Sequence, residues 1–211
     1  MTNIWGQENV SLDVPDGVRV EYPEGSVNPA NSPPLPLGGA GFELYFAASA
    51  ALSLTLTYQV QFQADFAFNK GGKLPGLFGG SAPRGCIPDG EDGFSARLMW
   101  RAGGAGELYL YAPGGDTVCG QSIGRGSWTF VPGVLYTITE QITMNDIGNN
   151  NGSIQVFING TQVVDAENLV LRNTDAVLVD GLLFSTFFGG SDSTWASPQD
   201  QWAIFQSFSV Q

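Results

Sequence analysis

The chain is dominated by short segments in which apolar and polar residues alternate. Alternation with a period of two is typical of β-strands that bury one face. Gly and Asn clusters separate the segments, and Asn159-Gly160 lies between two of them as a strong signal for a two-residue hairpin. The clearest alternating segments are residues 52–63, 94–100, 107–111, 136–143 and 154–158.

This pattern predicts an all-β fold. Many short antiparallel strands in 211 residues indicate a β-jelly roll sandwich of two antiparallel sheets. We find no internal repeat and no linker, so we expect one domain over residues 1–211. No run of 18 apolar residues occurs, and we therefore expect no membrane span.

The alternation also predicts which side chains share a face. Gln61 opposes the apolar residues of the segment around residues 58–68. Ser95, Arg97, Met99 and Arg101 share one face of the next segment, and Tyr109 and Tyr111 share one face of the segment after it. We expect these segments to be successive strands with a common polar face. A solvated outer sheet usually looks similar, but it carries Lys, Glu and Thr more often than tyrosines beside arginines.

The charge of the chain is unevenly distributed. The net charge is −12, which disfavours nucleic acid and anionic membranes as partners. Residues 70–125 hold six of the eight cations and five acids, for a net charge of +1, whereas the remainder has two cations and 15 acids, for −13. Some of these cations will pair with nearby acids. The others indicate recognition of specific anionic groups.

The residue types exclude several kinds of chemistry. The chain has no histidine, which excludes Ser-His-Asp triads and most zinc sites. A glycosidase needs two facing carboxylates, but Glu107 and Glu140 are the only acids well inside predicted strands. The remaining Tyr, Arg, Lys and Ser suit β-elimination on a polyuronate. Cations would stabilise the enolate that forms when C5 loses its proton, and a tyrosine with a lowered pKa would take that proton.

Several motifs in order resemble the polysaccharide lyase families 14 and 20, which contain alginate lyases and glucuronan lyases. The most specific is Lys70-Gly-Gly-Lys-Leu-Pro-Gly, followed by a Ser-x-Arg and a Tyr-x-Tyr motif. The similarity covers about residues 55–210. Its segments are residues 66–80, 94–100, 108–112 and 184–192, with Trp195 and residues 200–202.

The resemblance implies a jelly roll with a cleft across one sheet. It also implies that Lys73, Ser95, Arg97, Tyr109 and Tyr111 form the catalytic site. By this resemblance, the lysine and the arginine neutralise the uronate carboxylate. One of the two tyrosines acts as the acid and base. No cofactor is needed; a structural calcium ion held by Asp192 and Asp200 is conceivable, although no motif shows it.

We add Gln61, Lys70 and Arg101 as substrate-binding residues. Gln61 and Arg101 lie on the expected polar face, and Lys70 would lie at the rim of the cleft. The expected partner is an acidic polysaccharide, with glucuronan favoured over alginate from the general appearance of the loop sequences. The alternatives are a non-catalytic carbohydrate-binding jelly roll, a glycoside hydrolase and a structural β-sandwich.

Two features favour a secreted protein, which we expect to be a monomer. Cys86 and Cys119 are an even count in loop-like sequence and suit one disulfide, although two free thiols would give the same count. Asn-x-Ser/Thr sequons start at Asn9, Asn151 and Asn159.

Overall fold

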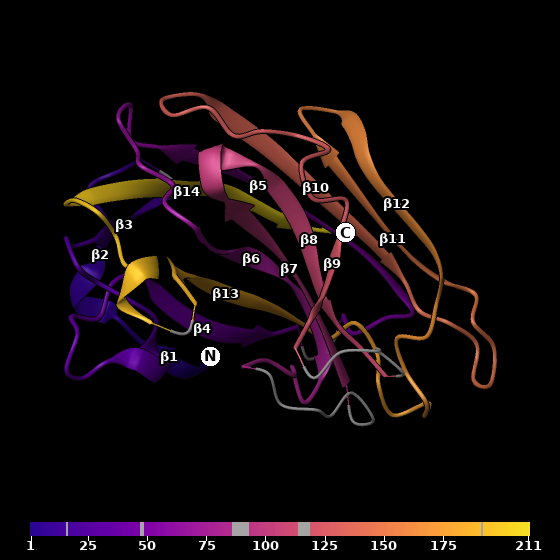
Figure 1. Cartoon of the computed structure of the whole chain (residues 1–211). Helices are drawn as coiled ribbons and strands as arrows, with labels where there is room; N and C mark the ends of the chain where they lie inside the picture. Colours follow the sequence, from indigo (N-terminus) through magenta and orange to yellow (C-terminus); the bar gives the residue numbers. More distant parts are fainter. Residues whose placement is uncertain (16, 47–48, 86–92, 114–118, 191) are drawn as a thin grey trace.

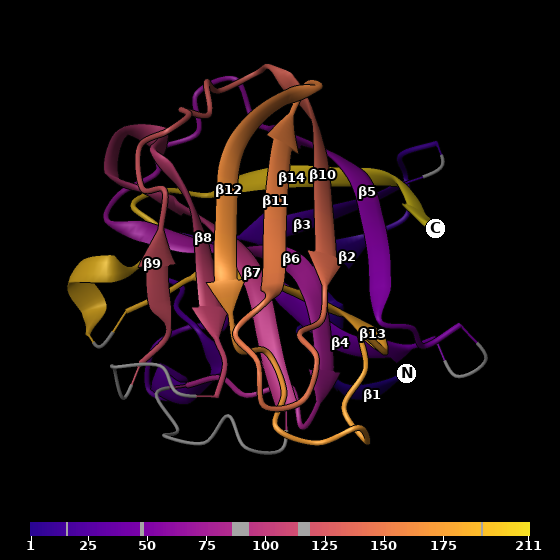
Figure 2. The ribbon, with the colours of Figure 1, turned by 90° about the vertical axis from the view of Figure 1, so that its right-hand side faces the viewer.

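The chain forms two antiparallel sheets of seven strands each that pack face to face (Figures 1 and 2). The computed structural model describes residues 1–15, 17–46, 49–85, 93–113, 119–190 and 192–211. The first sheet has the order β1 (Thr2–Trp5), β4 (Ala40–Tyr45), β13 (Gly181–Phe188), β6 (Gly71–Gly80), β7 (Gly93–Arg101), β8 (Gly106–Tyr111), β9 (Gln121–Ile123). The second sheet has the order β12 (Thr161–Leu169), β11 (Gly152–Ile158), β10 (Leu135–Thr143), β5 (Ser53–Phe62), β14 (Gln201–Val210), β3 (Gly17–Tyr22), β2 (Val10–Ser11).

This architecture confirms the prediction of an all-β sandwich. The helical elements of the described residues are short 3₁₀ turns: η1 (Gln7–Asn9), η2 (Pro29–Asn31), η3 (Ala102–Gly104) and η4 (Ser193–Trp195). None of the helices in the described part of the chain has the length and apolarity needed to cross a membrane.

Aromatic side chains from both sheets meet in the core. Phe62 of the second sheet and Trp100 of the first have ring centroids 5.6 Å apart in an edge-on arrangement. Trp100 also contacts Phe188 of β13 at 5.2 Å. All three rings are almost completely buried. Such offset and edge-on contacts add to the stabilisation that burial of the rings already gives.

The predicted hairpin is present between β11 and β12. Asn159 and Gly160 both have positive φ angles, 50° and 80°. A two-residue turn with positive φ at both positions matches the right-handed twist of the flanking strands. The prediction from the Asn-Gly pair is therefore confirmed.

Of the three sequons, the one at Asn9 is inaccessible to glycosylation in the folded chain. The Asn9 side chain is buried, and its amide nitrogen donates hydrogen bonds to the carbonyl oxygens of Leu37 (3.2 Å) and Gly39 (2.9 Å). That nitrogen is the atom that a glycan would modify. Asn151 and Asn159 are exposed. Cys86 lies outside the described residues, so its pairing with Cys119 stays a prediction.

Strand β6 is irregular between Lys73 and Gly76, and side chains of the second sheet hydrogen-bond to it there. We call this irregularity the β6 bulge. The pairing of β6 with both of its neighbours shifts register between Lys73 and Gly76. Pro75 within it has no N–H to give to a sheet ladder. The Tyr58 hydroxyl donates to the Pro75 carbonyl at 3.1 Å, and the Leu77 N–H donates to Glu140 Oε2 at 2.9 Å. The two side chains thus satisfy backbone groups that the shifted ladder leaves open.

Glu140 is a carboxyl group in the middle of the sandwich. It is completely buried, and its Oε1 atom has no hydrogen-bond partner among the described residues. Burial raises its pKa well above the usual value, and the hydrogen bond from Leu77 offsets this only in part. The group is therefore neutral in the fold at pH values where it ionises in the unfolded chain.

We predict that Glu140→Gln removes a component of the pH dependence of stability. Between the pKa of Glu140 in the unfolded chain and its higher pKa in the fold, the native state holds a proton that the unfolded state lacks. The wild-type free energy of unfolding should fall with rising pH in this window, by at most about 1.4 kcal/mol per pH unit from this group. Glu140→Gln should show a flatter profile in urea unfolding measured from pH 5 to 8.

The exposed Glu167 of β12 provides the matched control. Glu167→Gln should leave the profile parallel to that of the wild type. Parallel profiles for Glu140→Gln and wild type would contradict the assignment of a neutral buried carboxyl.

Candidate active site

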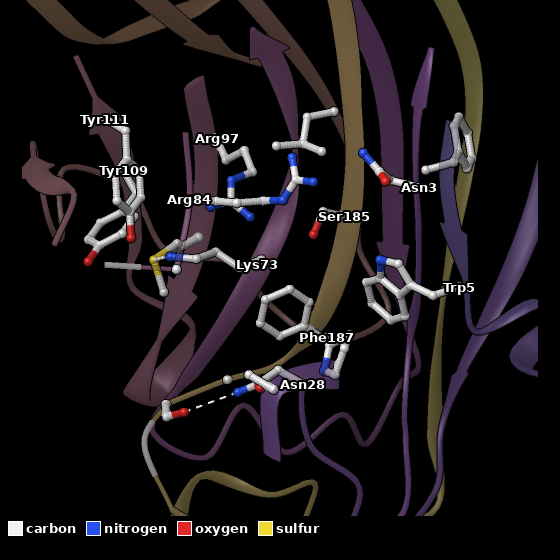
Figure 3. A pocket seen from close by; sticks show the side chains of 18 of the residues that line it. Asn3, Trp5, Asn28, Lys73, Arg84, Arg97, Tyr109, Tyr111, Ser185 and Phe187 are labelled. Carbon is white, nitrogen blue, oxygen red and sulfur yellow. Dashed lines mark hydrogen bonds between the residues drawn. The ribbon is translucent and has the colours of Figure 1, made fainter. Parts of the chain in front are cut away.

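A pocket of about 780 Å³ crosses the outer face of the first sheet. Strands β6, β7 and β8 form one end of it, and β13, β4 and β1 form the other. Figure 3 shows two tyrosines on one side and the indole of Trp5 on the other, with cations and the ring of Phe187 between them. The pocket therefore runs across the strands, so a long ligand in it would contact several of them.

Strands β7 and β8 supply the polar residues that alternation predicted. Arg97, Met99 and Arg101 of β7 line the pocket, as do Tyr109 and Tyr111 of β8. Arg97 pairs with Tyr109 in the register of these two strands. Adjacent residues such as Trp100 and Leu110 point into the core instead. The pleat thus explains why these positions meet at one surface.

Lys73 reaches the pocket from a glycine-rich strand. Residues 71–80 form the central strand β6, and Lys73 lies opposite Met99 on one side and Phe187 on the other. Its Nζ atom is 2.6 Å from Met99 Sδ and 3.5 Å from the centre of the Tyr109 ring. Leu74 is in the core. Gly and Pro, which often indicate a loop, here accompany a bulge within a strand.

Two of the cations in the pocket lack an acidic partner among the described residues. The Arg97 side chain is only 2% exposed, and its Nε atom has no hydrogen-bond partner. In the described part of the chain, no carboxylate forms an ion pair with Arg97 or Lys73. A buried charge without a partner is costly, so this arrangement favours binding of an anion.

Burial and like charge lower the pKa of both groups. Burial lowers the pKa of Arg97 to about 10, and the neighbouring tyrosines Tyr111 and Tyr109 partly counter it. The pKa of Lys73 falls well below that of free lysine because the side chain is desolvated and lies near Arg97 and Arg101. A carboxylate bound between them would relieve both effects.

Arg101 differs from these two cations because Glu107 holds it. Its Nη2 atom is 2.6 Å from Glu107 Oε1, and Arg125 Nε is 2.5 Å from Oε2 of the same carboxylate. Ser122 donates a further hydrogen bond to Oε2 at 2.6 Å. These partners hold the pKa of Glu107 low although burial acts to raise it. Glu107 therefore fixes Arg101 at the edge of the pocket.

The two tyrosines lie against each other. Their ring centroids are 5.5 Å apart at an interplanar angle of 78°. Burial, together with the charge of Tyr111 and a hydrogen bond to it, raises the pKa of Tyr109 to about 12. For Tyr109 the expectation of a lowered pKa is wrong, because these effects outweigh that of Arg101. Tyr109 thus stays protonated near neutral pH.

Two further predicted site residues, Ser95 and Lys70, do not line the pocket itself. Ser95 is completely buried below the pocket, where its hydroxyl donates to the Pro83 carbonyl at 2.5 Å. Lys70 is exposed at the rim, donates to the Thr194 hydroxyl and lies 5.7 Å from the ring of Trp195, which lines the pocket.

The placement of Gln61 on the face of Arg101 is wrong. Gln61 belongs to β5 of the second sheet, and its side chain donates to the Gly133 carbonyl at 2.8 Å. Consecutive alternating segments were taken as neighbouring strands, but β5 pairs with β10 and β14. Its polar face is therefore on the other side of the sandwich.

The described lining of the pocket contains one carboxylate, that of Glu43, and therefore no carboxylate pair. Glu107 is held by arginines at the pocket, whereas Glu140 lies in the core. Asp192 accepts a hydrogen bond from the Thr194 N–H at the start of η4, and Asp200 accepts one from the Glu24 N–H. No group of three or more His, Cys, Asp or Glu side chains suited to a metal ion occurs among the described residues.

Several residues that line the pocket were not expected from the sequence. Met99 was on the predicted polar face but was not proposed as a site residue. Arg84 reaches the pocket from the segment after β6, where its Nη1 atom is 2.6 Å from Glu43 Oε1. Trp5 and Phe187 line the far end. No local signal in the sequence marks Trp5, because only the pairing of β1 with β4 brings it to this sheet.

Comparison with known proteins agrees with this geometry. The family model described as Polysaccharide lyase 14 matches residues 13–208. The crystal structure of the marine PL-14 alginate lyase from Aplysia kurodai is 33% identical, with a TM-score of 0.85, and the match covers 100% of this chain and 89% of that one. The alginate lyase Aly36B is 26% identical, with a TM-score of 0.82 and coverage of 99% and 85%.

More distant matches share the fold alone. The endo-β-1,4-glucuronan lyase from the fungus Trichoderma reesei is 11% identical, with a TM-score of 0.61 and coverage of 98% and 89%. No curated protein matches the chain. The family match spans nearly the whole sequence and includes every residue of the cationic end of the pocket. The chain therefore belongs to polysaccharide lyase family 14.

Proposed function

We propose that this polysaccharide lyase cleaves alginate by β-elimination in the pocket of the first sheet. One observation carries the proposal: Lys73 and Arg97 face the tyrosine pair without an acidic partner among the described residues. A polyuronate brings one carboxylate on each sugar ring. Its binding would supply the negative charge that the pocket lacks.

The proposed roles follow from the positions of the side chains. Lys73 and Arg97 hold the carboxylate of the sugar to be cleaved and stabilise the enolate that forms beside it. Tyr111, acting as its phenolate, takes the proton from C5, the bond between C4 and O4 breaks, and a C4=C5 double bond forms. Tyr109, which keeps its proton because of its raised pKa, gives a proton to the leaving O4. The step needs no water.

Similarity supports alginate over glucuronan as the substrate. The structures that are 33% and 26% identical are both described as alginate lyases. The glucuronan lyase is only 11% identical, and this similarity is too low to support a shared substrate. The earlier preference for glucuronan rested on the general appearance of the loops, and no contact in the pocket supports it.

The first prediction from the proposed function concerns the reaction and its substrate. The purified protein should raise the ultraviolet absorbance of alginate, because elimination leaves a conjugated double bond and hydrolysis does not. Polymannuronate, polyguluronate and glucuronan should be tested side by side, with Lys73→Ala and Tyr111→Phe. Each substitution should lower kcat by about 100-fold or more. Binding of all these polymers without any rise in absorbance would instead support a non-catalytic carbohydrate-binding protein.

The second prediction concerns Arg97. A lysine keeps the positive charge but loses the planar fork that holds a carboxylate with two parallel hydrogen bonds. Arg97→Lys should therefore reduce kcat/KM on alginate by about 10- to 100-fold. Arg19→Lys is the matched control, because Arg19 pairs with Asp13 and Glu21 on the second sheet. Equal activity of Arg97→Lys and wild type would refute bidentate binding by Arg97.

A further inference from the structure

The pocket continues beyond its cationic end onto an aromatic surface. Trp5 of β1 and Phe187 of β13 line this part, with ring centroids 5.9 Å apart and an interplanar angle of 58°. We call these two rings the aromatic shelf. Figure 3 shows Trp5 on the side of the pocket opposite the tyrosine pair, with Phe187, Lys73, Arg84 and Ser185 between the two sides.

The backbone holds the indole of the shelf in a defined place. Trp5 pairs with Gly41 of β4, and a Cβ atom at Gly41 would lie 2.5 Å from indole atoms. The missing side chain at Gly41 therefore gives the ring its position against the strand. Both Trp5 and Phe187 are half-buried, so each keeps part of its ring open to the pocket. An aromatic ring in a fixed position costs little conformational entropy when a ligand binds.

Polar groups beside the shelf suit an acidic sugar. Arg84 lies between the shelf and Arg97 (Figure 3), and its side chain is 37% exposed. Its contacts with described residues, to Ala82 and Glu43, both use Nη1. A guanidinium has five N–H donors, so this pattern leaves donors for a carboxylate. Asn3 lines the same end of the pocket and adds an amide.

Trp5 is too far from Lys73 for both side chains to contact the same sugar ring. Three strand spacings separate β6 from β1, which corresponds to about 14 Å at 4.7–4.9 Å per spacing. Phe187 bridges the gap, since it lies directly opposite Lys73 in the pairing of β13 with β6. A polymer that lies across the strands with one ring at Lys73 would therefore pass Phe187 and place a later ring over Trp5.

We propose that Trp5, Phe187, Arg84 and Asn3 form a second uronate subsite. The aromatic rings pack against the apolar face of a sugar ring, and Arg84 and Asn3 hydrogen-bond its carboxylate and hydroxyl groups. This inference rests on the proposed function, because it takes the same polyuronate as the ligand. Asn3 and Trp5 lie before residue 13, where the family match begins. The subsite is thus built partly by a segment outside that match.

Chain length of the substrate provides the test. Wild type, Trp5→Ala and Trp5→Phe should be compared on alginate oligosaccharides from the disaccharide to the hexasaccharide and on polymer. On the longer substrates, Trp5→Ala should raise KM by roughly five- to tenfold, the factor expected for one lost aromatic contact, with little change in kcat. On the shortest substrate that is cleaved, Trp5→Ala and wild type should agree. Trp5→Phe should restore most of the affinity.

Trp202→Ala is the control, because Trp202 is half-buried on β14 of the second sheet. It should leave KM unchanged at every length. An equal KM for Trp5→Ala and wild type at all lengths would overturn the subsite. An equal loss at all lengths would also overturn it, since that result indicates a general effect on the fold.

A binding measurement separates this inference from the proposed function. Calorimetric titration of Tyr111→Phe with alginate tetrasaccharide should give a Kd that Trp5→Ala, added to it, weakens by a similar factor. If wild type cleaves no polyuronate but this weakening is observed, the subsite stands and the lyase assignment fails. If wild type cleaves alginate and the added substitution leaves Kd unchanged, the subsite fails alone.

Discussion

The β6 bulge determines which side chains of the central strand reach the pocket. Leu74 and Leu77 are both completely buried, although residues three apart on a regular strand would point to opposite faces. The shift in register between Lys73 and Gly76 resolves this conflict and leaves Lys73 on the pocket side. The bulge leaves backbone groups unpaired, and Tyr58 and Glu140 satisfy them from the opposite sheet. The position of the lysine in the pocket therefore depends on polar contacts that cross the core.

Some cations of the pocket form ion pairs with carboxylates, and others do not. Glu107 balances Arg101, and Glu43 balances Arg84. Lys73 and Arg97 have no such partner among the described residues and lie between these two pairs. Ion pairs thus fix the edges, and the centre keeps an excess of positive charge in a partly desolvated place. This arrangement is preorganised for an anion, because the residues that would bind it need not first release another carboxylate.

Alternation in the sequence predicted the parts that depend on a single strand. It placed Arg97 and Arg101 on one face of β7 and the tyrosines on one face of β8, because side chains of a strand alternate whatever the strand pairs with. It could not place Gln61, since the order of strands in a sheet depends on pairing between distant segments. The same limit hid Trp5, which the pairing of β1 with β4 brings to the pocket. The raised pKa of Tyr109 also depends on packing, because burial and Tyr111 together outweigh the nearby cation.

The uneven distribution of charge affects how a polyanion would meet this protein. Outside residues 70–125 the chain carries a net charge of −13, so most of its surface repels such a polymer at a distance. The attractive cations are in a pocket, where they act over a short range. Added salt would screen the long-range repulsion between exposed charges but would weaken contacts with buried Arg97 much less. Moderate ionic strength should therefore speed the encounter between enzyme and polyuronate, the reverse of the usual effect of salt on a basic enzyme.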